Sequence, residues 1–153
     1  MSLLEPPPGR QVFTGDFTAR PSDIDDNGHV NNVVYLDWAQ QLAIAHWRAK
    51  APADAQAQWA WIALRHEIDY RRPLLPDETA HGRTWVSGTA EGPRFDRYVR
   101  IDAADGAMCA QATTTWVLIE QAAGRPRRVP AWMVEMSPKA RQPTIERSMP
   151  RTM

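Results

Sequence analysis

The sequence has 153 residues, of which 43% are hydrophobic and 24% charged, a composition typical of a single globular domain with its own core. Eighteen basic side chains balance eighteen acidic ones, which excludes a global charge that would attract nucleic acid or an anionic membrane. We expect a cytoplasmic protein, because the sequence shows no signal-peptide pattern, no apolar run near the roughly 18 residues that cross a bilayer, and one cysteine, Cys109, that cannot form an internal disulfide.

We expect one domain over residues 1–153, with loosely ordered ends. Residues 1–9 contain three consecutive prolines, and residues 137–153 mix proline, arginine and serine without an apolar period. The first regular element predicted is a strand over Gln11–Arg20, where apolar side chains lie among threonines. A polar turn region follows over Pro21–Gly28.

The clearest pattern in the sequence is that of a long helix over Asn31–Lys50. Its apolar side chains recur at helical spacing, at Val34, Trp38, Leu42 and Ala45. An asparagine can cap its start, and basic side chains lie in its last turn. About twenty residues would span roughly 30 Å. A helix of this length in a short chain is expected to be the element around which the rest folds.

Four strands are predicted after the helix, separated by breaks that contain proline or glycine: Trp61–Arg71, Thr79–Thr89, Arg94–Asp102 and Met108–Glu120. In the first of them, five side chains are expected to share one face: Ile62, Leu64, His66, Ile68 and Tyr70. The breaks are too short for crossover helices, so we expect an antiparallel meander. The predicted fold class is α+β, with one antiparallel sheet of about five strands around the helix. An open apolar sheet face indicates at least a dimer.

A dense polar stretch, Asp23 to Asn32, lies directly before the helix. If this stretch is extended, four side chains alternate onto one side: Asp23, Asp25, Asn27 and His29. Unpaired amides and the dipole at the start of a helix favour negative charge. A carboxylate beside such amides suits acyl transfer, because it can act as nucleophile or base while the amides hold the developing oxyanion.

Other readings of the polar stretch use the same residues. Asp and Asn before a helix are often caps or turn formers. An EF-hand calcium loop is disfavoured, because Val34 stands where that loop needs a bidentate Glu. A zinc site formed by Asp25, His29 and His66 lacks a ligand-spacing motif. We expect no metal and no nucleotide cofactor, since no glycine-rich loop precedes a helix. A serine nucleophile elbow is also missing from the sequence, and Cys109 is expected in the core.

Residues 20–35, Arg-Pro-Ser-Asp-Ile-Asp-Asp-Asn-Gly-His-Val-Asn-Asn-Val-Val-Tyr, resemble the active-site segment of hot-dog thioesterases. The segment is similar both to the 4-hydroxybenzoyl-CoA thioesterase group and to plant acyl-ACP thioesterases, and its Asp-x-Asp-x-Asn-x-His-Val-Asn-Asn string is especially close to the latter. The resemblance is strong over about residues 16–48 and weaker over residues 68–72 and 124–130. It implies the hot-dog fold and hydrolysis of an acyl thioester.

The resemblance also implies roles for particular residues. Asp25 corresponds to the catalytic carboxylate, as nucleophile or general base. Asn27 and His29 would orient Asp25, water or the thioester. The backbone amide near Asn32 would polarise the thioester carbonyl, and Asp23 would be structural.

The sequence departs from the acyl-ACP group at one position. That group places a Glu after Tyr-Arg-Arg, whereas this chain has Pro73 there. A mechanism that requires this Glu does not transfer to the chain directly. His66 or Glu67 of a neighbouring chain is the expected substitute.

The implied activity is hydrolysis of acyl-CoA or acyl-carrier-protein thioesters to free acid and thiol, by a homodimer or homotetramer with no cofactor beyond the coenzyme A of the substrate. A non-catalytic acyl-CoA-binding hot-dog module is the alternative, which the intact Asp-Asn-His set disfavours. Trp38 and Trp61 are candidates for lining an acyl or aryl pocket. The candidate contacts for coenzyme A phosphates are arginines: Arg71, Arg72, Arg94, Arg97, Arg125, Arg127 and Arg128.

Overall fold

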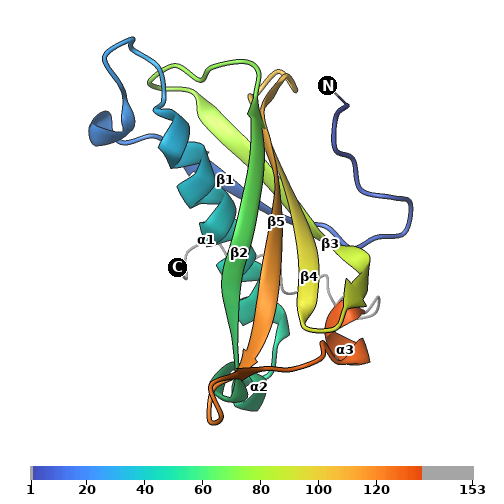
Figure 1. Ribbon diagram of the computed structural model, residues 1–153. Coiled ribbons are helices and arrows are strands. Elements are labelled where there is room, and N and C mark those ends of the chain that lie inside the picture. The colour runs from blue at the N-terminus through green and yellow to red at the C-terminus, as the bar shows by residue number, and fades with distance from the viewer. Residues whose placement is uncertain (1, 136–153) are drawn as a thin grey trace.

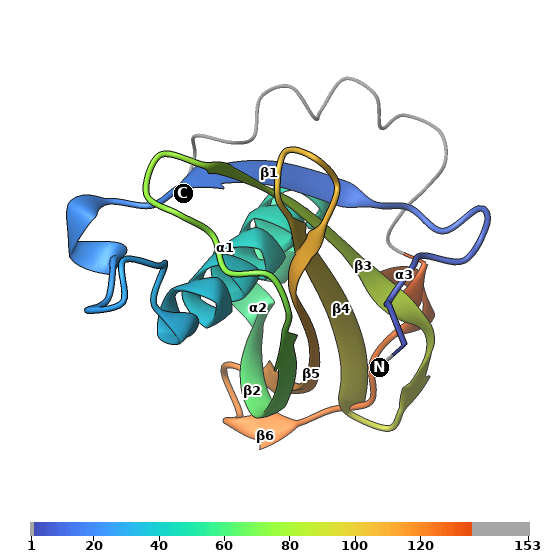
Figure 2. The ribbon, with the colours of Figure 1, turned by 90° about the horizontal axis from the view of Figure 1, so that it is seen from above.

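The computed structural model describes residues 2–135, so the expected loose segment 137–153 lies outside the described residues. An antiparallel sheet curls around one long helix, α1 (Asn32–Lys50), as Figures 1 and 2 show. The strands are β1 (Phe13–Thr18), β2 (Trp59–Tyr70), β3 (Thr79–Glu91), β4 (Arg94–Asp102), β5 (Met108–Glu120) and the short β6 (Arg125–Pro126). Their order is β1-β3-β4-β5-β2, and β6 pairs with β5. The predicted α+β class with a single antiparallel sheet is confirmed.

Three short helical segments complete the described part of the chain: η1 (Pro21–Asp23), α2 (Ala53–Gln58) and α3 (Ala131–Val134). Helix α2 joins α1 to β2 and was not predicted. Its sequence, Ala-Asp-Ala-Gln-Ala-Gln, is rich in strong helix formers. None of the helices within residues 2–135 is long and apolar enough to cross a membrane.

Helix α1 begins and ends where its sequence signals lie. The side chain of Asn31 caps the helix by accepting a hydrogen bond from the Val33 N–H at 3.2 Å. At the other end, Ala51 is extended because it precedes a proline. The side chains that the helix buries against the sheet are Tyr35, Trp38, Ala39, Leu42, Ala43 and His46.

The middle of α1 lies very close to β1 and β3, at two glycines. A Cβ atom at Gly82 would lie 3.0 Å from Leu42 Cδ2 and 3.2 Å from the Gly15 carbonyl oxygen. A Cβ at Gly15 would lie 2.9 Å from Leu42 Cδ1. The absence of side chains at these two positions allows Leu42 to seat against the sheet backbone.

Leu42→Ala should therefore lower the free energy of unfolding by about 2–5 kcal/mol, because a leucine that is 3% exposed leaves a cavity that the rigid sheet fills poorly. Val33→Ala, on the same helix but 68% exposed, is the matched control and should change stability by less than about 0.5 kcal/mol. Urea denaturation of both variants measures the difference. Equal losses in the two variants would contradict this packing.

Strand β2 contains a bulge that breaks the predicted alternation. Its pairing with β5 shifts register between Ala63 and Arg65. Ile62 and Leu64 are consequently 56% and 54% exposed, whereas His66 is half-buried. The prediction that these side chains share one face was wrong, because one extra residue exchanges the two faces of the strand.

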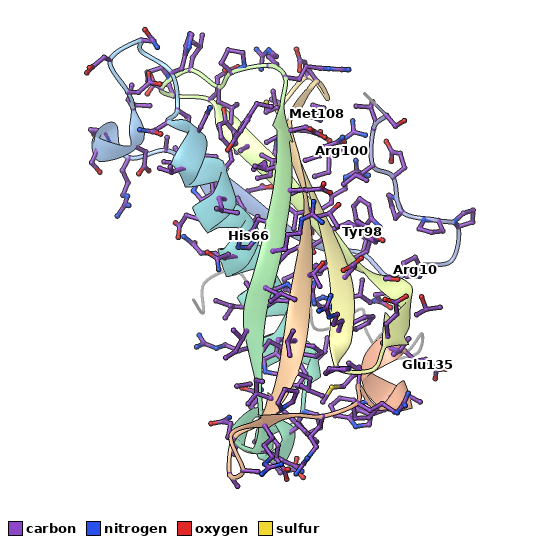
Figure 3. All side chains as sticks on the ribbon, in the orientation of Figure 1. Arg10, His66, Tyr98, Arg100, Met108 and Glu135 are labelled. Atoms are coloured by element: carbon purple, nitrogen blue, oxygen red, sulfur yellow. The ribbon has the colours of Figure 1, made fainter. Side chains whose placement is uncertain are left out.

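The N-terminal segment lies along the outer face of the sheet, which is the face away from α1. Figure 3 shows Arg100 on this side, toward the segment. Glu5 forms ion pairs with Arg100 and Arg83, and the Leu4 N–H donates to Gln111 Oε1 at 2.8 Å. Loose order was expected for residues 1–9; the structure gives residues 2–9 these contacts with the sheet.

Candidate active site

The polar stretch before α1 forms a compact loop. The chain reverses at Gly28, whose φ of 81° lies in the left-handed region that glycine adopts freely. An isolated bridge joins Ile24 to Val30, and the Asp25 N–H donates to the His29 carbonyl at 2.8 Å. The segment is therefore not extended, and the expected alternation of Asp23, Asp25, Asn27 and His29 onto one side does not occur.

Within this loop the Asp25 carboxylate is held by one of its two oxygens. Oδ1 accepts the N–H groups of Asn27 at 2.9 Å and His29 at 3.2 Å. Within residues 2–135, Oδ2 accepts no hydrogen bond, and the residue is half-buried. One oxygen thus orients the carboxylate, and the other remains available to a water molecule or a substrate atom.

Asp23 has a different environment. Its Oδ2 accepts the backbone N–H of Arg20 at 2.8 Å, and its carbonyl accepts the Asn31 N–H at 2.8 Å. The hydrogen bond from the Arg20 backbone lowers the pKa of this buried carboxyl below its usual value. Both carboxyl and carbonyl of Asp23 therefore serve the loop, which supports the structural role expected for it.

Asn32 is the first residue of α1 and lies next to the loop. Its carbonyl accepts a hydrogen bond from the Tyr70 hydroxyl at 3.1 Å, which ties the end of β2 to the start of the helix. Its N–H has no hydrogen-bond acceptor among the described residues. The structure thus joins the backbone amides of Asn27 and His29 to the Asp25 carboxylate, and Asn32 follows this loop in sequence with an unpaired amide at the positive end of the helix dipole.

A cavity of about 400 Å³ lies between the C-terminal half of α1 and the sheet. Aromatic side chains form much of its wall: Trp47, Trp61, Phe95 and Trp116. Exposed Ile44 and Ile62 lie among the lining residues. None of the four expected site residues lines the cavity. Among the lining residues on α1, Gln40 is nearest to the start of the helix, and it lies about 12 Å along the helix axis from Asn32, at about 1.5 Å per residue. The cavity is therefore well separated from the polar loop of the same chain.

The two tryptophans proposed as pocket residues have different positions. Trp61 lines the cavity, as the sequence suggested. Trp38 is buried in the core, where it stacks on Phe17 with the ring centroids 5.2 Å apart. Trp47 and Trp116 were not singled out, because their place on the cavity wall depends on the curvature of the sheet.

Three polar residues are buried between α1 and the sheet, Arg97, His46 and Thr84, and the sequence did not predict their contact. Arg97 Nη1 lies 2.9 Å from His46 Nδ1 and 3.1 Å from Thr84 Oγ1. Because arginine only donates, His46 Nδ1 accepts and the imidazole is neutral, with its proton on Nε2. Burial is the main cause that holds the pKa of His46 well below its usual value. Arg97 had been a candidate phosphate contact, and its burial contradicts that interpretation.

The neutral His46 should make stability fall in mild acid. Unfolded histidine titrates near its ordinary pKa of 6.5, and the folded pKa lies well below it, so between these values only the unfolded state binds the proton. The free energy of unfolding should decrease below about pH 6.5 by up to about 1.4 kcal/mol per pH unit. Urea denaturation at about pH 7.5 and about pH 5.5 should show this slope in wild type and lose it in His46→Gln. An unchanged slope in the variant would show that other groups cause it.

The two candidates to replace the Glu missing at Pro73 lie on opposite faces of β2. His66 is half-buried on the face toward α1, as Figure 3 shows, and its Nδ1 lies 2.8 Å from Thr114 Oγ1. Glu67 is exposed on the outer face, where it pairs with Arg65 at 3.0 Å. Only His66 is on the side of the sheet that carries the helix and the cavity.

Arginines at both ends of the molecule remain candidates for binding phosphate. Four of them are exposed and form no ion pair among the described residues: Arg71, Arg94, Arg125 and Arg128. Arg127 is also exposed but pairs with Glu120, and half-buried Arg72 pairs with Glu78. Within residues 2–135, no group of three or more His, Cys, Asp or Glu side chains is arranged to hold a metal ion.

A long helix inside a curled antiparallel sheet, with a polar loop at the start of the helix, defines a hot-dog protein of the thioesterase type. Residues 19–136 match the thioesterase-like superfamily, and the chain belongs to that family. No curated protein sequence matches the chain.

Solved structures share the fold. A predicted thioesterase from Bacillus stearothermophilus is 23% identical with a TM-score of 0.72, over 82% of this chain and 94% of its own. A 1,4-dihydroxy-2-naphthoyl-CoA thioesterase from Synechocystis is 17% identical with a TM-score of 0.72, over 86% and 100%. A hypothetical protein from Staphylococcus aureus in complex with CoA is 14% identical with a TM-score of 0.72, over 94% and 89%. The predicted hot-dog fold is confirmed.

Proposed function

We propose that the protein hydrolyses acyl-CoA thioesters, with Asp25 as the general base or nucleophile. The observation that carries this proposal is the Asp25 carboxylate, which two backbone amides hold by Oδ1 while Oδ2 remains unpaired among the described residues. As a base, Oδ2 removes a proton from water as the water attacks the thioester carbonyl, and the carbon–sulfur bond then breaks to give acid and thiol. The Asn32 amide at the helix start stabilises the oxyanion.

Coenzyme A is the favoured thiol because two neighbours are named for it, one as a naphthoyl-CoA thioesterase and one as a complex with CoA. The cavity of about 400 Å³ suits an acyl group alone, so the coenzyme would lie outside it. The exposed arginines are then available to its phosphates.

We also propose a homodimer in which β2 pairs with the β2 of a second chain. Strand β2 is at the edge of the sheet, and its outer backbone groups have no partner within the described chain. It carries the exposed side chains of Ile62 and Leu64. A long apolar edge strand is a liability in a monomer and a template for pairing with another chain. Antiparallel pairing of two β2 strands would extend one sheet across both chains.

This dimer would bring together the cavity and the carboxylate that one chain keeps apart. A two-fold axis at the β2 edge makes the two α1 helices antiparallel on the same side of the sheet. The start of one helix then lies beside the C-terminal half of the other, which borders the cavity. Each proposed site combines the cavity of one chain with Asp25 of the other. His66, on the helix side of β2, is the residue we propose in place of the Glu missing at Pro73.

Thiol release from a panel of short, long and aromatic acyl-CoAs tests the activity. Release well above the uncatalysed rate with at least one of them is the expected result. Binding of acyl-CoA without thiol release from any member would instead support the non-catalytic module.

A further inference from the structure

Arg97, in the middle of β4, is a buried cation that no carboxylate of the described residues pairs with. Only 8% of the residue is exposed, and it lines the cavity. Its Nη1 donates to His46 and Thr84, which are both neutral. Among residues 2–135 no carboxylate pairs with it, and its Nε and Nη2 donate no hydrogen bond. The adjacent Asp96 also lines the cavity, but no ion pair joins it to Arg97, and its carboxylate accepts from Thr115 Oγ1 at 2.8 Å.

A charge in this position is costly unless something pairs with it. Removing an ion from water costs several kcal/mol even after the protein relaxes, and buried charges in proteins are normally paired. Burial lowers the pKa of Arg97 only to about 10, so the guanidinium remains charged at neutral pH. The cavity wall therefore carries a buried guanidinium that no carboxylate of the described chain pairs with.

Further unsatisfied groups near Arg97 are also donors. Trp116 lines the same cavity, and its buried Nε1–H has no acceptor in the described part of the chain. His46, which contacts Arg97, also has a buried Nε2–H without an acceptor there, but it does not line the cavity, so only Arg97 and Trp116 offer donors to a ligand. Donors without acceptors indicate that the missing partner is an acceptor group, and the charge on Arg97 indicates that this group is negative.

We propose that the cavity binds an acyl group that carries a carboxylate at the end remote from the thioester, and that Arg97 is the residue that selects it. The substrate class is the coenzyme A half-thioester of a dicarboxylic acid. This assignment rests on the proposed thioesterase function and specifies its substrate. Exposed Ile44 and Ile62 lie where the acyl group would enter, and buried Phe95 lies next but one to Arg97 on β4. The apolar walls pack on the acyl carbons, and the carboxylate meets the free guanidinium edge.

Specificity follows from the same contacts. An uncharged acyl group of equal length would fill the apolar part of the cavity but leave Arg97 desolvated and unpaired. Sites built to bind a polar substrate group reject analogues that lack it strongly, because the buried partner is then left unsatisfied. Adipoyl-CoA and heptanoyl-CoA make a suitable pair of probes, since they are similar in length and differ in the terminal carboxylate.

The test compares kcat/KM for these two substrates in wild type, Arg97→Met and Arg48→Met. Wild type should prefer adipoyl-CoA by about 100-fold or more. Arg97→Met should remove that preference, lowering kcat/KM for adipoyl-CoA by about 100-fold and raising it for heptanoyl-CoA, because no unpaired charge remains. Arg48→Met is the matched control, since Arg48 is exposed on α1, and should keep the wild-type ratio.

Binding measured separately distinguishes failure of this assignment from failure of the proposed hydrolysis. Trp47, Trp61 and Trp116 line the cavity, so tryptophan fluorescence should report binding of either acyl-CoA. Arg97-dependent binding of adipoyl-CoA without thiol release would retain the assignment and contradict the hydrolysis. Hydrolysis of both substrates with equal kcat/KM in wild type would retain the thioesterase and overturn the assignment. The wild-type ratio decides this even if Arg97→Met does not fold.

Discussion

Asp25→Asn should lower kcat by about 10²-fold or more, because an amide can neither take a proton from water nor attack the thioester. KM should change little, since the carboxylate acts at the reacting centre rather than on the bulk of the substrate. The fold should persist, because the Asn side chain keeps the Oδ1 that accepts the amides of Asn27 and His29. Steady-state kinetics with the best acyl-CoA, together with the melting temperature, measures both effects.

Two neighbouring carboxylates provide the controls. Asp26 is exposed and makes no hydrogen bond within the described chain, so Asp26→Asn should leave kcat within about twofold of wild type. Asp23→Asn should affect stability more than activity, because Asp23 is buried and accepts the Arg20 N–H. If Asp25→Asn keeps activity within a few-fold, Asp25 is only a turn residue, since Asn serves that role as well as Asp.

Much of the fold could be predicted because its signals are local. The helix expected over Asn31–Lys50 is observed over Asn32–Lys50, and the strands expected over Arg94–Asp102 and Met108–Glu120 have the bounds that were predicted. Apolar periodicity, a capping asparagine and glycine or proline breaks set these limits. The bulge at Leu64 could not be predicted in this way, because the side-chain pattern of β2 is compatible with unbroken alternation and only the pairing with β5 reveals the extra residue.

The candidate site was predictable in location but not in geometry. The motif located the loop at residues 23–32, yet its reversal at Gly28 depends on backbone torsions that alternation does not describe. The contact of His46 with Arg97 joins residues 51 positions apart, and no periodicity relates them. The separation of Asp25 from the cavity likewise depends on how the sheet curls around α1.

That separation leads to a prediction about mixed dimers. Asp25→Asn removes the carboxylate of a chain, and Ala43→Phe should fill its cavity, because buried Ala43 lines the cavity from α1. Each variant alone should be nearly inactive as a homodimer. When the two are co-expressed and combine at random, half of the dimers contain one chain of each kind, and in those one of the two sites has both an intact carboxylate and an intact cavity. The mixture should therefore recover about a quarter of the wild-type activity.

A site formed within one chain predicts the opposite outcome. Every chain in the mixture would then carry one defect, and mixing would restore nothing. Doubly tagged heterodimers, purified away from both homodimers, sharpen the comparison, because about half of the wild-type activity is then expected from a shared site. Leu64→Asp supplies an independent control at the interface, because Leu64 is exposed on β2 and does not line the cavity: a buried carboxylate at the paired β2 edges should favour the monomer in light scattering and abolish activity together with the dimer. A monomer that keeps full activity would show that Asp25 reaches its own cavity without a second chain.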